Sequence, residues 1–139
     1  MRYLFPLVLT LACGGPDFTG TYKGSITTSG NCADTASWPI LESSATTWTV
    51  VETSDIVTIA TSGTCGNFVA DATGSTAKLR KKSCPRFTEG ASTIQVTYTS
   101  GDFTLNGNAL TGVVQFEAVA SGGTYRSCAG NTTATFIRN

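Results

Sequence analysis

Apolar and polar residues alternate along the chain from residue 93 to residue 119, with breaks at Ser100-Gly101 and at Asn106-Gly107. Side chains on a β-strand repeat with a period of two, whereas an amphipathic helix repeats every 3.6 residues. Asn-Gly is also a strong signal for a two-residue hairpin turn. The stretch therefore predicts three antiparallel strands joined by tight turns at the two breaks.

Shorter alternating runs flank this stretch. Residues 18–27 predict a long first strand with Gly20 and Gly24 on its apolar face, where a sheet curls or another backbone comes close. Further strands are expected at 46–52, 55–60, 67–71, 75–80, 124–127 and 132–137, with long loops at 29–44 and 81–91. About 8–10 short strands without helical periodicity predict an all-β fold, a single antiparallel meander barrel, with a β-sandwich as the alternative.

Bulky and small residues share the predicted inner face. The expected core is Trp48, Phe68, Leu79, Tyr98, Phe103, Val114, Phe116 and Phe136. Small residues fall at other inner positions: Gly20, Gly24, Gly112, Ala118 and Ala134. They either leave a cavity for a small apolar ligand or let the sheets approach closely with no cavity. The first outcome favours a binding module, and the second a structural protein.

Composition narrows the chemistry. The 139 residues give room for one domain, and equal numbers of acidic and basic residues make the formal net charge zero. Only 13% of residues are charged, so long-range electrostatics do not favour nucleic acid as a partner. The chain has no histidine, the commonest general base and metal ligand. No Gly-x-Ser-x-Gly segment is present and no carboxylate pair stands out, so we expect a non-catalytic protein without cofactor or metal.

The first residues resemble an export leader. Arg2 is followed by an apolar run at 3–12, about half the length that spans a bilayer, and then by Cys13-Gly14. Ala12 directly before Cys13 resembles the lipobox of bacterial lipoproteins. That resemblance implies a signal peptide at 1–12, a lipidated tether at 13–17 that begins with diacylglyceryl Cys13, and the barrel domain at 18–139. The alternatives are an ordinary signal peptide with free Cys13, or a buried first strand.

Location and barrel type also rest on short resemblances. Gly14 after the cysteine resembles the outer-membrane sorting pattern, which implies a lipoprotein on the periplasmic or surface face of a bacterial outer membrane. The membrane would then be a partner through the lipid anchor, alongside a small apolar ligand or another envelope protein. The Gly-x-aromatic start of the first strand, Gly20 to Tyr22, resembles lipocalins and other up-and-down barrels.

Four cysteines remain if Cys13 carries lipid, and four cysteines allow three pairings. Cys65 and Cys84 lie almost symmetrically about a turn near Gly74, so a hairpin brings them together. Pairing of Cys32 with Cys128 follows by exclusion and would tie the first long loop to the penultimate strand. A zinc site is the alternative, but the chain has no Cys-x-x-Cys spacing and the expected compartment is oxidising.

Two segments are candidate binding surfaces. Five basic residues fall within nine positions: Lys78, Arg80, Lys81, Lys82 and Arg86. They suit an anionic envelope lipid or glycan, or else they are solvated lysines and arginines that protect a strand edge. Trp38, in a loop before Pro39, is a candidate for exposed binding or for a plug at one barrel end.

The third candidate is the Ser-Gly-x-x-Tyr segment at residues 121–125. It resembles the first motif of small barrel-shaped lysozyme-inhibitor lipoproteins, in which the serine reaches into the lysozyme cleft. The resemblance implies that Ser121 makes this contact and that Tyr125 shapes the loop. The second motif of that family, Tyr-x-x-x-Thr-Lys-Gly, is absent, and a plain turn is the alternative.

Overall fold

The computed structural model describes residues 15–33, 40–122 and 126–139. Every regular element in these ranges is a β-strand, and none of their residues belongs to a helix long and apolar enough to cross a membrane. The strands are β1 (Gly20–Cys32), β2 (Ile40–Thr53), β3 (Ile56–Ala60), β4 (Phe68–Thr73), β5 (Thr76–Leu79), β6 (Lys82–Ser83), β7 (Phe87–Glu89), β8 (Ser92–Asn106), β9 (Ala109–Ser121) and β10 (Arg126–Arg138).

Eight of these strands close into an antiparallel barrel. The order β5-β4-β3-β2-β1-β10-β9-β8 is completed by pairing of β5 with β8, with Ala77 opposite Phe103. β6 and β7 pair with β8 farther along the same edge. The predicted all-β meander barrel is therefore confirmed, and the sandwich alternative is not adopted.

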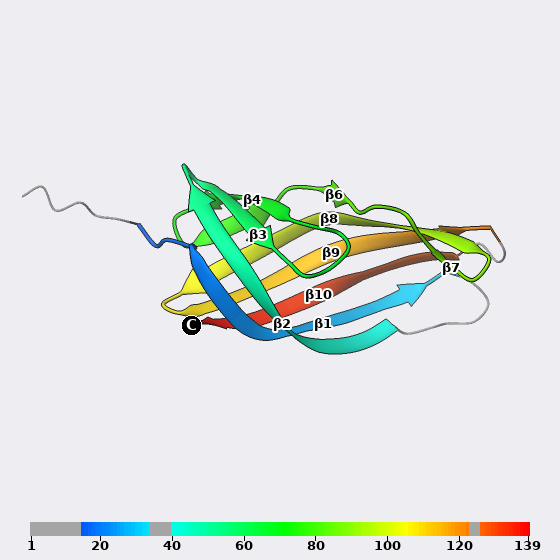
Figure 1. The fold of residues 1–139 in the computed structure, drawn as a ribbon, viewed down its shortest axis with the longest axis horizontal. Coiled ribbons are helices and arrows are strands. Elements are labelled where there is room, and N and C mark those ends of the chain that lie inside the picture. The colour runs from blue at the N-terminus through cyan, green and yellow to red at the C-terminus, as the bar shows by residue number, and fades with distance from the viewer. Residues whose placement is uncertain (1–14, 34–39, 123–125) are drawn as a thin grey trace, which may run out of the picture.

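The barrel is closed along only part of its length. β3, β4 and β5 have 5, 6 and 4 residues, whereas β1, β2, β8, β9 and β10 have 13 to 15. The long strands consequently continue past the short ones as a curved sheet, which gives the molecule its elongated shape in Figure 1. The C-terminus lies at the end where the barrel is closed, and the opposite end is open (Figure 1).

The prediction of a turn at Ser100-Gly101 is wrong, because both residues lie within the continuous strand β8. A register shift between Tyr98 and Ser100 marks a β-bulge instead. Gly101 is buried, and a Cβ there would lie 3.0 Å from Val114 Cγ2 and 3.2 Å from Leu79 Cβ. This glycine makes room for its neighbours and does not turn the chain.

The predicted boundaries are also wrong around the long loops. β1 continues to Cys32 and β2 begins at Ile40, inside the segment predicted as a loop, while β6 and β7 occupy part of the second predicted loop. β10 is one strand where two were expected. These segments belong to the sheet beyond the barrel, where the two faces do not differ enough in burial to produce an alternating pattern.

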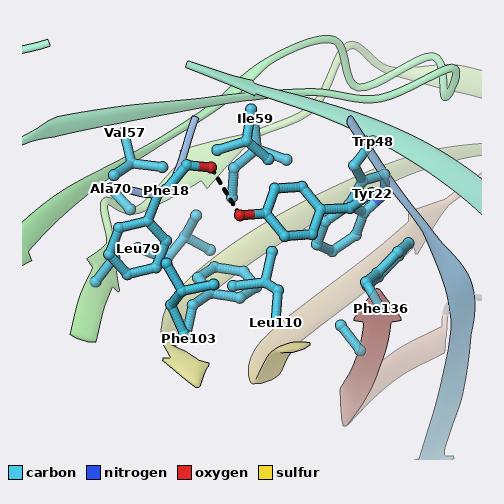
Figure 2. Close-up of a cluster of buried hydrophobic side chains, with 14 of the residues drawn as sticks. Phe18, Tyr22, Trp48, Val57, Ile59, Ala70, Leu79, Phe103, Leu110 and Phe136 are labelled. Carbon is cyan, nitrogen blue, oxygen red and sulfur yellow. Dashed lines mark hydrogen bonds between the residues drawn. The ribbon is translucent and has the colours of Figure 1, made fainter. Parts of the chain in front are cut away.

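One end of the barrel is plugged by Phe18, which precedes β1, and by Tyr22 near the start of β1. Phe18 and Tyr22 are fully buried, and the Tyr22 hydroxyl donates to the Phe18 carbonyl over 2.9 Å (Figure 2). Arg138 donates to the Tyr22 hydroxyl from Nε at 3.0 Å, and its guanidinium lies 5.2 Å from the centre of the Tyr22 ring. The Phe18 amide donates to a Glu52 carboxylate oxygen at 2.8 Å, which fixes the plug against β2.

The rest of the core is the inner face of the barrel strands. Six of the eight predicted core residues are buried: Trp48, Leu79, Phe103, Val114, Phe116 and Phe136. Phe68 and Tyr98 are half-buried and pack against this cluster from the open end. Figure 2 shows how the aromatic rings of Trp48, Phe103 and Phe136 converge from different strands.

Both predicted disulfides are present. Cys65–Cys84 joins the β3–β4 connection to the residue after β6. Cys32 and Cys128 are direct partners in the register of β1 and β10, with their Cα atoms 3.9 Å apart. Cys32 ends a strand and does not lie in a loop as expected, so this bridge ties together the far ends of two neighbouring strands.

Candidate functional site

A cavity of about 400 Å³ lies at the open end of the barrel. Its floor is apolar and is formed by Trp48, Ile59, Leu79, Phe103 and Val114. Its rim carries hydroxyl groups from Ser44, Thr46, Thr61, Ser62, Thr64 and Thr132. This volume, and the combination of an apolar interior with a few polar groups, are those of small-molecule sites in proteins.

Aromatic packing fixes the floor of the cavity. Trp48 stacks on Phe136 with ring centres 4.2 Å apart and meets Phe103 edge to face at 6.0 Å. Phe103 lies directly over Gly112, where a Cβ would be 2.3 Å from Phe103 Cδ1. Gly112 therefore allows the ring to lie against the strand, which leaves the space above it open.

The small inner-face residues serve both purposes expected of them, at different positions. Ala134 is buried and lines the cavity, where a larger side chain would occupy the space. Gly24 instead permits close approach of backbones, because a Cβ there would lie 2.0 Å from the Thr135 carbonyl oxygen. The cavity thus depends on Ala134 and Gly112, and the tight curvature of the wall on Gly24.

The mouth of the cavity lies between two different segments of the chain. On one side, β3 pairs with β2 only at residues 49–53, so the preceding half of β2 has no strand partner there among the described residues. Ser44, Ala45 and Thr46 on this half line the cavity. On the other side lies the β3–β4 connection at 61–65, which the Cys65–Cys84 bridge holds in place.

Lys82 stands beside the mouth on the inner face. It is the register partner of Tyr98, which faces the cavity, so the Lys82 side chain lies on the same side of the sheet. Its Nζ donates to the Asn67 carbonyl and lies 5.6 Å from the centre of the Phe68 ring. Phe68 and Tyr98 meet edge to face, with ring centres 5.0 Å apart. Burial raises the pKa of Tyr98, so its hydroxyl stays protonated at neutral pH.

The other basic residues of the 78–86 segment do not share this face. Lys78 and Arg80 flank the inward Leu79 on β5 and point to the outside. Arg80 forms an ion pair with Asp71, with the nearest N and O atoms 2.5 Å apart. Hydrogen bonds from Arg80 lower the pKa of Asp71, and the same contacts raise the pKa of Arg80.

The remaining members of the segment are separate from one another. Lys81 is exposed, and with Arg80 and Lys82 it borders a shallow surface depression. Arg86 donates from Nε to Gln95 Oε1 at 3.1 Å. Arg80, Lys81 and Lys82 therefore border one surface depression, and of these three Lys82 also lies next to Phe68 and Tyr98, which line the cavity.

Several other predicted site residues lie outside the described residues, namely Cys13, Trp38 and Tyr125. Ser121 is exposed at the end of β9, and its Oγ lies 3.5 Å from the Thr93 carbonyl oxygen. Lysozyme inhibition through the loop at 121–125 stays a prediction. Within the described ranges, no three His, Cys, Asp or Glu side chains are grouped as metal ligands.

Sequence reasoning predicted much of the cavity floor as core, and it gave a cavity as one of two alternatives for the small inner-face residues. The hydroxyl rim and the inward placement of Lys82 were missed, because both depend on which strands end early. Comparisons of the chain with protein-family models, with curated proteins and with solved structures find no match.

Proposed function

We propose that the protein is a non-catalytic binding module that holds a small, largely apolar ligand in the open end of its barrel. The observation that supports this proposal is the cavity of about 400 Å³ with an apolar floor and a rim of hydroxyl groups. A purely structural envelope protein would have no need of such a space, because filling it with side chains would stabilise the fold.

We further propose that the protein is a bacterial cell-envelope lipoprotein, anchored in the outer membrane through Cys13. The leader-like run before Cys13 and the small residue at Ala12 support this part of the proposal. Asp17 and Phe18 lie at the plugged end of the barrel, where Arg138 donates to the Asp17 carbonyl. A lipid on Cys13 would accordingly hold the plugged end near the membrane and direct the mouth away from it.

Titration of the purified protein with N-phenyl-1-naphthylamine, a neutral apolar fluorophore, tests the binding proposal. We expect saturable binding that weakens at least tenfold in Ala134→Phe, because the new ring fills the cavity. Ala129→Phe is the matched control, since Ala129 is exposed on the same strand. Equal probe binding by the two variants, with both folded by circular dichroism, would refute the cavity as the site.

Intact mass of the mature protein tests the anchor. A diacylglycerol adduct on a chain that begins at Cys13 supports the envelope proposal. A mature chain without lipid would overturn it, while leaving the cavity proposal intact.

A further inference from the structure

Among the described residues, the cation Lys82 lies next to a cavity whose lining is uncharged. All the described residues that line the cavity are neutral. Lys82 lies just beyond them, half-buried, on the inner face where β5 has ended and β6 has taken its place beside β8. The residue is half-buried, but its hydrogen bond to Asn67 is exposed, so the ammonium group is accessible to a ligand that enters the mouth.

No carboxylate among the side chains that the structure describes forms an ion pair with Lys82. The ion pair found in those residues joins Arg80 to Asp71 on the outer face. The Lys82 ammonium donates one hydrogen bond, to the Asn67 carbonyl, and has three N–H groups in all. Two N–H groups therefore stay available for an acceptor that is not part of the described chain.

The Lys82 side chain is held in position before any ligand arrives. The hydrogen bond to Asn67 fixes Nζ, and the ring of Phe68 lies beneath it at 5.6 Å, within the range of a cation–π contact. Phe68 in turn packs edge to face against Tyr98. Because these contacts restrict the lysine, less side-chain entropy is lost when it binds an anion.

The same two aromatic residues connect Lys82 to the cavity. Phe68 and Tyr98 both line the cavity, as does Cys65 of the neighbouring connection. A ligand whose anionic end meets Lys82 at the rim can therefore extend its apolar part past these rings toward Trp48 and Phe103. Hydroxyl groups on residues 61–64 border the same opening and can donate to the anion.

We propose that the ligand is an anionic amphiphile, with its carboxylate or phosphate bound by Lys82 and its single apolar chain in the cavity. This inference rests on the proposed binding function and adds the chemical class of the ligand. It assigns a role to one lysine of the basic segment, and gives no such role to Lys78, Arg80 or Lys81.

Displacement of N-phenyl-1-naphthylamine by four twelve-carbon amphiphiles tests the proposal. The competitors are dodecanoate, dodecyl phosphate, dodecanol and dodecyltrimethylammonium, each kept below its micelle concentration. We expect at least one of the anions to displace the probe at a concentration at least tenfold lower than dodecanol does. The better of the two anions identifies the head group as a carboxylate or a phosphate. Charge attraction at the rim should also weaken as salt is added.

Lys82→Gln should bring the anions to within about twofold of dodecanol and leave dodecanol itself unchanged, since the loss of one charge removes this preference. Lys82→Arg should keep the preference, and Lys81→Gln is the matched control at an exposed neighbouring lysine. Thermal unfolding of each variant shows whether it is folded. A preference for anions that survives Lys82→Gln would overturn the proposal.

Failure of the two proposals can be told apart. If the probe binds and dodecanol displaces it as well as both anions do, the cavity binds apolar ligands and the inference about Lys82 is wrong. If neither the probe nor any amphiphile binds, the proposed function itself is wrong.

Discussion

Removing the Cys32–Cys128 bridge should destabilise the protein more than removing Cys65–Cys84. The first bridge joins residues 96 positions apart, whereas the second joins residues 19 positions apart. A cross-link stabilises mainly by restricting the unfolded chain, and the restriction grows with the logarithm of the closed loop. All four sulfur-bearing side chains are half-buried, so replacing either pair by serine removes similar packing.

The size of the difference follows from the two loop lengths. Loop-closure entropy gives about 4.7 kcal/mol for a loop of 96 residues and about 3.2 kcal/mol for one of 19 at 25 °C. While the shorter bridge is intact it shortcuts part of the longer loop, which lowers the larger figure by about 0.2 kcal/mol. The free energy of unfolding should thus fall by about 1 kcal/mol more when the Cys32–Cys128 bridge is lost.

Urea denaturation of three oxidised proteins measures this difference: the wild type, Cys32→Ser/Cys128→Ser and Cys65→Ser/Cys84→Ser. Extrapolation to zero urea gives each free energy of unfolding. Probe binding adds a second readout, since only the Cys65–Cys84 bridge holds a wall of the mouth, and its loss should weaken binding. An equal or larger destabilisation from the loss of Cys65–Cys84 would refute the reasoning from loop size.

Three further changes test the barrel itself. Gly130→Ala should destabilise by about 1–3 kcal/mol in urea denaturation, because its Cβ would lie 2.1 Å from a backbone oxygen of β1. Gly63→Ala should change stability by less than about 0.5 kcal/mol, because its Cβ would only make an ordinary contact of 3.6 Å with Thr61 Oγ1. Phe18→Ala should cost about 3–5 kcal/mol in the same assay, because it removes the buried plug of the barrel. Asp71→Asn should destabilise the protein slightly at pH 6, because it removes the ion pair with Arg80, which lowers the pKa of Asp71 in the folded state. The stabilisation from this pair is fully present above the unfolded pKa of about 3.9 and is lost as the pH falls through the folded pKa. Wild type and Asp71→Asn should therefore unfold at the same urea concentration near pH 2, and a constant difference from pH 2 to pH 6 would contradict this.

Local signals in the sequence were enough for the hairpins of the closed barrel. The Asn106-Gly107 turn is present, and Gly107 has the positive φ of 58° that such turns require. The Cys65–Cys84 pairing could be predicted because the hairpin that joins the two cysteines turns at Gly74. In each case the residues that decide the structure are close in sequence.

The sequence pattern did not distinguish glycines within strands from glycines at turns. Gly101 and Gly130 both interrupt the apolar alternation, and both segments were read as breaks between strands. Gly101 faces Val114 across the sheet, and Gly130 faces Gly30, so their purpose depends on a strand distant in sequence. Sequence pattern alone does not state which strand that is.

The candidate site depended on the same kind of distant pairing. Lys82 follows Lys81 in a run without alternation, and only its register with Tyr98 places it on the inner face. The cavity exists because β3, β4 and β5 are shorter than their neighbours. Neither fact leaves a signal in the local order of residues.

The half of β2 before residue 49, which has no partner strand on the β3 side among the described residues, should affect the solubility of the protein. Between residues 40 and 48 this strand presents unpaired backbone donors and acceptors to solvent within the described part of the chain, and Glu42 is the only charged residue there. An open strand of this length is a template on which other molecules add strands, so self-association in concentrated solution should begin there. A lysine in place of exposed Thr47 would act as a gatekeeper against that growth and raise solubility.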